Sequence, residues 1–410
     1  MRKLLFIASA LVLGACGDEP LEVDFPGRIP TEQLDDPSLA PVLANSVLGD
    51  FECAFSNYTA ASAFQSDEFE TSNSNLPGRL WGERGISAAD DWYVTFQCED
   101  TGLAWGLQRP LHTARFQAEQ IFAKLDEWTD EQVPNRTLLK AQVRTYGAYS
   151  YVIFGETFCA VSFDGGPQSP PEAALAIAET QFAEAITLAQ AAGTSAAATD
   201  ILNLARVGLA RTKMNLKKWS EAAAAAQLVP AGYRRDVTRG SDNSRRWNDI
   251  NRSVAEVGGY IVADAYRTMN DPRVMVADAG RGSFIPTNRL WITTKYTTNA
   301  SPIRLASYQE AQLILAEALI EQNQVAEGMT VINAGRAAVG LGPLSAGTQA
   351  EARAHLIDER RKELSFEGGH RLNDLLRFDI PWKIGANVYT GNPYGVTTCW
   401  PYPLKEVNGA

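Results

Sequence analysis

Three glutamates near the carboxyl end are the residues whose type and spacing most suggest chemistry. Glu359, Glu363 and Glu367 recur every four residues in a segment with helical periodicity, which places their carboxylates on one helix face. Carboxylates that hydrolyse a glycosidic bond must instead face each other across a substrate cleft. We therefore interpret the three glutamates as structural residues and predict no catalytic residue.

Carboxylates spaced in this way repel each other on an exposed helix by a few tenths of a kcal/mol. Cations must offset that repulsion, and the glycines at 368 and 369 allow the chain to bend back. We expect the partners of the glutamates to be three arginines of the same segment, Arg360, Arg371 and Arg377. With Asp374, these residues form a charged signature over residues 359–378.

Other motifs for metal binding, nucleophilic catalysis or phosphate binding are missing from the sequence. The histidines, at positions 112, 355 and 370, and the cysteines lack metal-ligand spacing. No nucleophile elbow or phosphate-binding glycine loop occurs. We predict neither a metal nor a cofactor. The net charge of −11 also argues against a nucleic-acid partner, because phosphate binding needs clustered cations.

Aromatic residues concentrate in two segments that lack a sustained helical period, 65–108 and 231–301. Aromatic rings stack against the C–H faces of sugars while polar groups at the rim bond the hydroxyls. They suit peptides too, and for each residue packing inside the protein is an equally good alternative. The candidate ligand-binding residues are Trp81, Trp92, Tyr93, Trp247, Trp291 and Tyr296. We assign packing roles to the other tryptophans, at 105, 128, 219, 382 and 400.

The remainder of the chain is dominated by helical periodicity, with apolar residues three and four positions apart. The predicted helices cover residues 36–64, 110–128, 136–154, 171–191, 199–216, 220–228, 308–322, 325–339 and 349–366, and the last can continue to Arg377. We therefore predict an all-α fold.

The helices are expected to pack as consecutive pairs, over about residues 110–230 and 302–340. Residues 205–222 carry a small Gly208 on the first helix, Trp219 at the turn and Ala222 early in the second helix. This arrangement is close to the tetratricopeptide pattern, in which small residues let paired helices touch. A run of such pairs builds a curved scaffold.

The amino terminus has the order of parts found in an export signal. Arg2 and Lys3 precede an apolar run over residues 4–13, which is too short to span a bilayer because a spanning helix needs about 20 residues. Leu13-Gly-Ala-Cys16 resembles the lipobox of bacterial lipoproteins, in which the cysteine is acylated and the chain is cut just before it. An ordinary signal peptide with a chance cysteine is the alternative.

Residues 16–35 are rich in acidic residues, proline and glycine, so we predict a flexible tether after a signal peptide of residues 1–15. Some 20 extended residues reach roughly 60–70 Å. The acidic pair Asp18-Glu19 resembles the surface-export signal of Bacteroidetes-type lipoproteins. This resemblance implies that the folded body, residues 36–410, stands on the outer face of an outer membrane.

The remaining cysteines are even in number, as expected for an exported protein with two disulfides. Four cysteines allow three pairings, and four free thiols are a further alternative. We favour Cys53–Cys98 and Cys159–Cys399.

The charged signature resembles the carboxy-terminal run of the SusD/RagB family of outer-membrane nutrient-binding lipoproteins, Glu-Arg-x-x-Glu-Leu-x-Phe-Glu-Gly-x-Arg-x-x-Asp-Leu-x-Arg. Here Gly369-His370 stands where the family usually has one residue before Arg371. Further matches follow in the family's order: Asn270-Asp-Pro-Arg273, Lys295-Tyr296, Ile303-Arg304, Ala316-Glu-Ala318, Ile332-Asn333 and the ending Cys399-Trp-Pro-Tyr-Pro403.

The resemblance implies an all-α body of four tetratricopeptide-like helix pairs with an irregular ligand-facing part. It also implies a partner, a TonB-dependent β-barrel transporter of the SusC type, for which the protein captures glycans or peptides as a hinged lid. The first alternative is a membrane-tethered tetratricopeptide scaffold that binds protein. A glycan-degrading enzyme is the second alternative, for which the sequence supplies no catalytic residues.

Overall fold

The structure, a computed structural model, describes residues 33–98 and 105–407. Most of these residues are helical, which confirms the all-α prediction. The longer helices are α1 (Ala40–Gln65), α4 (Gln108–Glu127), α5 (Arg136–Thr157), α6 (Glu172–Ala191), α7 (Ala196–Asn215), α8 (Trp219–Gln227), α10 (Tyr308–Glu321), α11 (Val325–Ala338), α12 (Gln349–Glu363) and α13 (His370–Arg377). None of the described helices is long and apolar enough to cross a membrane.

Short elements occupy the two segments that were predicted to be irregular. They are α2 (Leu76–Gly82), α3 (Trp92–Thr95), α9 (Asp264–Arg267) and the strands β1 (Phe69–Thr71), β2 (Arg234–Val237), β3 (Tyr260–Val262), β4 (Val276–Gly282), β5 (Arg289–Thr293) and β6 (Ile303–Ser307). The 3-10 turns are η2 (Pro37–Leu39) and η3 (Ser244–Arg246), η4 (Asn251–Glu256) is a π-helical turn, and α14 (Leu404–Val407) follows near the carboxyl end.

The strands form three antiparallel two-stranded sheets, β1–β3, β2–β6 and β4–β5. Periodicity did not predict them because each covers at most seven residues. The β1–β3 pair is the most informative, since it places Phe69 opposite Val262 and so joins the two irregular segments. Residues that lie about 190 positions apart in the chain therefore form one part of the molecule.

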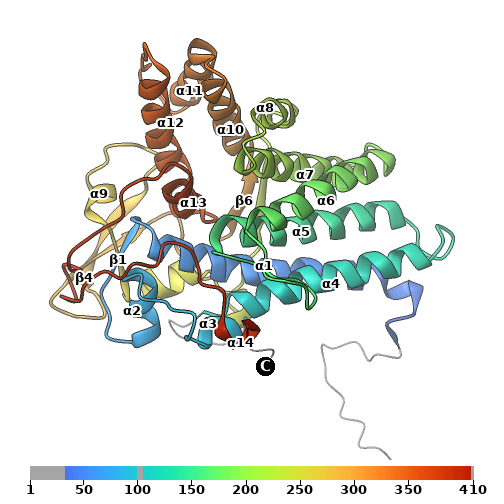
Figure 1. Ribbon diagram of the computed structural model, residues 1–410, viewed down its shortest axis with the longest axis horizontal. Coiled ribbons are helices and arrows are strands. Elements are labelled where there is room, and N and C mark those ends of the chain that lie inside the picture. The colour runs from blue at the N-terminus through green and yellow to red at the C-terminus, as the bar shows by residue number, and fades with distance from the viewer. Residues whose placement is uncertain (1–32, 99–104, 408–410) are drawn as a thin grey trace, which may run out of the picture.

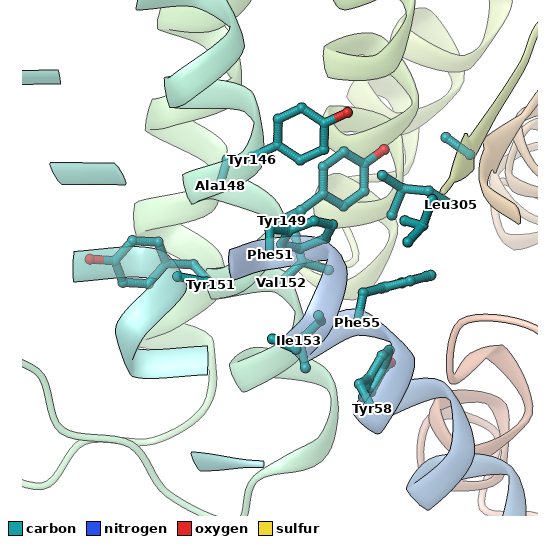
Figure 2. Close-up of a cluster of buried hydrophobic side chains, with 14 of the residues drawn as sticks. Phe51, Phe55, Tyr58, Tyr146, Ala148, Tyr149, Tyr151, Val152, Ile153 and Leu305 are labelled. Atoms are coloured by element: carbon teal, nitrogen blue, oxygen red, sulfur yellow. The ribbon is translucent and has the colours of Figure 1, made fainter. Parts of the chain in front are cut away.

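Helix α1 lies at the centre and contacts α4, α5, α2, β1 and α13. From Phe51 to Gln65 it is buried on every face, which is expected of a helix surrounded by protein. The Phe51 ring stacks on Phe55 of the same helix and packs against Tyr146 and Tyr149 of α5, with Phe51 5.3 Å from Tyr146 between ring centroids (Figure 2). This aromatic core connects α1 to the helices that follow.

The remaining long helices pack in sequence order, α4 on α5, α5 on α6 and α6 on α7, and lie side by side at the right of Figure 1. At the contact between α6 and α7, a Cβ on Gly208 would lie 2.2 Å from the Phe182 ring, so only glycine allows this approach. Helices α10, α11 and α12 form a second group, seen at the top of Figure 1. The tetratricopeptide-like character of these pairs stays a prediction.

The last predicted helix, 349–366, differs from the structure. Helix α12 ends at Glu363, and α13 begins only at His370. Between them Phe366, Gly368 and Gly369 have φ angles of 63°, 44° and 71°, which a continuous right-handed helix cannot contain. Residues 364–369 are therefore a tight turn, which we call the signature turn.

Two disulfides join distant parts of the fold in the favoured pairing. Cys53 on α1 is bonded to Cys98, and Cys159, just after α5, is bonded to Cys399 near the carboxyl end. Next to the second disulfide, Trp400 is fully buried and its indole N–H donates to Gln65 Oε1 at 2.5 Å. The carboxy-terminal segment is thereby held against α1 and α5.

Replacing Gly369 tests the signature turn. A Cβ there would lie 2.0 Å from the Tyr58 hydroxyl oxygen, at a φ of +71°. We expect Gly369→Ala to lower the free energy of unfolding by roughly 2–5 kcal/mol, because left-handed strain and overpacking add. Urea unfolding followed by circular dichroism measures the change.

The matched control is Gly335→Ala on α11, where a Cβ would meet nothing within 4 Å. Alanine has the higher helix propensity, so this variant should gain about 0.5–1 kcal/mol. Equal stability of the two variants would contradict the described turn.

Candidate functional site

The three signature glutamates converge on cations that come from elsewhere in the chain. Glu359 pairs with Arg273 at 2.8 Å and with Arg336 of α11. Glu363 and Glu367 both pair with Arg304 of β6, at 3.2 and 2.5 Å between charged atoms. Glu367 also binds Lys295 at 2.9 Å. We call the three glutamates and their cations the charge network, whose cations are Arg273, Lys295, Arg304 and Arg336.

The prediction that Arg360, Arg371 and Arg377 pair with these glutamates is wrong. Arg360 binds Asp374 at 2.9 Å, and Arg371 binds Asp67 at 2.6 Å. Arg377 pairs with Glu317 of α10 and Asp374 of α13. Arg360 follows Glu359 on α12 and projects about 100° away from it. Arg371 and Arg377 lie beyond the signature turn, on α13, and face other parts of the fold.

Every carboxylate of the charge network is paired with a cation, which leaves little scope for acid–base chemistry. Glu359 and Glu367 are only 2% and 5% exposed. Burial works against ionisation of Glu367, but the positive charges of Lys295 and Arg304 hold its pKa below the ordinary value. A general acid would need a raised pKa and access to substrate. The geometry therefore agrees with a structural role for the glutamates.

Four side chains from three separate segments bind the signature turn. Lys295 Nζ donates to Ser365 O at 2.8 Å, and the Tyr296 hydroxyl donates to Phe366 O at 2.9 Å. Arg211 of α7 donates to Gly368 O at 2.9 Å. Glu68 accepts from the Phe366 backbone N–H at 2.5 Å. Because these bonds satisfy buried backbone groups, the turn has one conformation within the fold.

Glu68 is the one buried acid at this turn whose pKa is raised, to about 8. Burial is the main cause; the N–H of Phe366 opposes it, and the negative charge of Asp67 adds to it. The folded protein therefore retains a proton that the unfolded chain releases at its lower pKa of 4.5. The contribution of this proton to the free energy of unfolding is complete below pH 4.5 and is lost as the pH rises towards 8.

The variant Glu68→Gln removes this linkage and keeps an acceptor for Phe366. We expect its free energy of unfolding, relative to the unaltered protein, to rise between pH 5 and pH 8 by up to about 1.4 kcal/mol per pH unit. Urea unfolding at pH 5, 6.5 and 8 measures the trend.

Asp271→Asn is the control, since Arg273 holds the pKa of Asp271 below its ordinary value despite partial burial, and Asp271 is not among the charges that act most on Glu68. The charged carboxylate stabilises the fold, and this contribution is lost only as the pH falls below its pKa. The decrease in the free energy of unfolding that the substitution causes should therefore stay constant from pH 5 to 8. Parallel pH profiles for Glu68→Gln and the unaltered protein would exclude the buried proton.

Three of the six candidate ligand-binding aromatics belong to the core. Trp81, Tyr93 and Tyr296 are at most 2% exposed. The Trp81 ring packs against Trp400, with 5.6 Å between centroids, and the Tyr93 hydroxyl donates to Pro401 O at 3.0 Å. Tyr296 binds the signature turn. The prediction that these three residues contact a ligand is therefore corrected. Their rings fill the core around short elements, which have no periodic apolar helix face of their own.

Trp92 and Trp247 are half-buried and lie in separate places. Trp92 of α3 packs edge-on against Trp81. Trp247 lies beneath the guanidinium of Arg252, 5.1 Å from its ring centroid, and its indole nitrogen has no hydrogen-bond partner among the residues that the structure describes. The structure therefore does not gather the predicted aromatics into one platform.

Trp291 lies in the arrangement best suited to a flat ligand. It is half-buried on β5, and the Arg267 guanidinium is 5.6 Å from its ring centroid. Arg267 also donates to the Tyr389 hydroxyl at 2.5 Å and pairs with Asp264 at 2.6 Å. Two half-buried rings, a guanidinium and a carboxylate thus come together. We call Trp291, Arg267, Tyr389 and Asp264 the aromatic platform.

The platform lies where three distant segments meet. Asn288, which precedes β5, donates to Ser72 Oγ at 3.0 Å and to Tyr389 O at 3.4 Å. Nearby in the chain, Phe284 and Val388 are 47% and 76% exposed. Tyr389 and Arg267 were missed because they lie outside any periodic pattern. The only signal was the turn-rich sequence Asn387-Val-Tyr-Thr-Gly391 that surrounds the tyrosine.

Among the described residues, no group of three or more histidine, cysteine, aspartate or glutamate side chains could hold a metal ion. Cys16, with the acidic pair and most of the tether, lies outside the described residues. The lipidation site therefore stays a prediction.

Comparison with known protein families and solved structures confirms the resemblance to SusD/RagB proteins. Residues 285–407 match the model of the SusD family. A SusD homolog from Bacteroides thetaiotaomicron superposes with a TM-score of 0.70 at 16% identity, covering 93% of this chain and 97% of that one. Among curated proteins, none is similar enough in sequence to count as a match.

Two further solved structures share the fold. A SusD-like carbohydrate binding protein from Bacteroides vulgatus has a TM-score of 0.65 at 16% identity, covering 84% of this chain and 83% of its own. A laminarin binding SusD-like protein has a TM-score of 0.64 at 17% identity, covering 91% and 97%. At such low identity these likenesses establish the fold.

Proposed function

We propose that this chain, whose carboxy-terminal part matches the SusD family, captures an oligosaccharide at the aromatic platform and delivers it to a partner transporter. The observation that carries the proposal is the position of Trp291 beside Arg267 and Tyr389. Binding rather than catalysis is inferred, because each of the clustered signature carboxylates is paired with a cation.

The chemistry of the platform suits sugars. A half-exposed indole offers its face to the apolar side of a pyranose ring. The Arg267 guanidinium donates to ring hydroxyls, and the Asp264 carboxylate, which is 80% exposed, accepts from them. A partly exposed platform accommodates a chain of sugars better than a closed cavity does, which favours an oligosaccharide over a single small molecule.

The described ligands of related proteins agree with this inference. One structure with this fold is a laminarin binding protein, and another is a carbohydrate binding protein. Peptides remain the other ligand class for such a surface, since aromatic rings and arginine bind them as well.

The proposal also includes the place of action. We infer that acylation of Cys16 holds the protein on the outer membrane, and that Asp18 and Glu19 direct it to the cell exterior. Several acyl chains on one residue anchor firmly, at about 0.8 kcal/mol per buried CH₂. The partner is a TonB-dependent β-barrel of the SusC type, over which the folded body acts as a lid.

A protein-binding scaffold is the second candidate. A cavity of about 400 Å³ lies along α10 and α11, lined by apolar residues that include Leu313, Val331 and Ile332. Such a groove suits a helix of a partner protein. This function predicts protein capture that is independent of the platform, and no affinity for oligosaccharides.

Replacing Trp291 by alanine tests the capture of oligosaccharide. Laminarin fragments and a panel of other oligosaccharides and peptides are titrated by calorimetry. We expect at least one oligosaccharide to bind the unaltered protein, and Trp291→Ala to weaken it about tenfold, or 1.4 kcal/mol, because the stacking surface is lost. Phe116→Ala is the matched control, since Phe116 is an aromatic residue 46% exposed on α4. Unchanged affinity of Trp291→Ala would remove the platform from the proposal.

The anchor is tested in cells with Cys16→Ser. We expect the protein to leave the membrane fraction and to lose co-purification with a β-barrel partner, because the lipid and the tether position the lid. Replacing Asp18 and Glu19 by alanine should keep the membrane anchor while abolishing digestion by protease added outside the cells. Retention of Cys16→Ser in washed membranes would contradict lipid anchoring.

A further inference from the structure

A second, polar cavity lies apart from the aromatic platform, between α3, the amino-terminal end of α4 and the loop after α5. Its volume is about 400 Å³, within the range of small-molecule pockets, about 300–1,000 Å³. The polar side chains that matter are Gln108, Arg109, His112, Arg115, Asp164 and Glu406. Neither Trp291 nor its neighbours line it, so a ligand here would be bound independently of the platform.

The cavity is balanced in charge. Arg115 and Asp164 form a bidentate pair, with N–O distances of 2.8 and 3.0 Å. The second arginine, Arg109, is exposed and has no carboxylate partner among the residues that the structure describes, although it donates to Thr95 O at 3.2 Å. Glu406 supplies the second carboxylate. Two positive and two negative groups favour a ligand without net charge.

Gln108 positions the second carboxylate of the cavity. The side chain is buried, with the residue 4% exposed, and its Nε2 donates to Glu406 at 3.3 Å. The Glu406 carboxylate is exposed and can accept further hydrogen bonds, so a donor on a ligand would be stabilised here.

His112 supplies a donor on another wall. Its Nδ1 lies 3.2 Å from Arg115 Nε, and arginine can only donate, so Nδ1 is the acceptor and the proton of the neutral ring is on Nε2. Burial, helped by the charge of Arg115, lowers the pKa of His112 to about 4. The imidazole is therefore neutral at physiological pH, and its orientation within the cavity wall is held by Arg115.

We propose that this cavity is a second binding site, for a small, neutral, hydroxyl-rich molecule of the size of a single sugar ring. A hydroxyl group both donates and accepts, so it can donate to Glu406 while accepting from Arg109 or His112. The balance of charges disfavours an acid or an amine. The site does not depend on the proposed function of the platform.

The test measures binding of monosaccharides to the full-length protein. Glucose, galactose, mannose and N-acetylglucosamine are compared with glucuronate, glucosamine and cyclohexanol by saturation-transfer NMR and calorimetry. We expect one neutral sugar to bind more tightly than its charged counterparts and cyclohexanol. Arg109→Ala and Gln108→Met should each weaken that binding at least fivefold. Arg234→Ala, an exposed arginine of β2 that lines neither site, should leave it unchanged.

One further variant and a measurement of thermal stability make the result decisive. Trp291→Ala should retain monosaccharide binding even where it weakens oligosaccharide binding, which separates the two sites. If Gln108→Met lowers the thermal midpoint, Arg109→Ala decides alone, because its side chain is on the surface. Undetectable binding of all four neutral sugars, equal binding by Arg109→Ala and the unaltered protein, or loss of binding in Trp291→Ala would each overturn the proposal.

Discussion

The pairing of buried carboxylates with cations from distant segments is the interaction on which the rest of this fold depends. Glu363 and Glu367 share Arg304 of β6, and Glu359 binds Arg273, which follows α9. Removing one partner of such a pair leaves an uncompensated buried charge, which typically costs about 3–5 kcal/mol. The network therefore requires the carboxy-terminal helices, the β6 strand and the irregular segment 231–301 to adopt their positions together.

The charge network and the signature turn also explain how the two long irregular segments are held in fixed positions. The signature turn accepts hydrogen bonds from Lys295, Tyr296 and Arg211, and donates one to Glu68. These side chains bring three separate segments to the same place, because only Lys295 and Tyr296 are neighbours in the chain. The β1–β3 pair then joins the first irregular segment to the second. Packing of buried rings such as Trp81 fills the space between these segments, where no periodic helix face is available.

The two binding proposals follow from what this framework leaves open. At the platform, Trp291 and Tyr389 are half-buried, and Arg267 connects their polar and aromatic parts. In the cavity beside α4, Glu406 and Arg109 have hydrogen-bonding capacity that the fold does not use. The platform suits an extended ligand because it lies at the surface, whereas the cavity suits a small one because its volume is about 400 Å³. Both sites are made by segments that meet only after folding.

The amino-acid sequence by itself determined the helices, because their apolar periodicity is local, and the family resemblance, because its motifs occur in order along the chain. It also placed the bend at Gly368 and Gly369, where glycine tolerates positive φ angles. Only the tertiary structure decided the partners of Glu359 and its neighbours, and which aromatic rings are exposed. Ion pairing and burial depend on residues far apart in sequence, such as Lys295 and Glu367, and periodicity carries no information about those contacts.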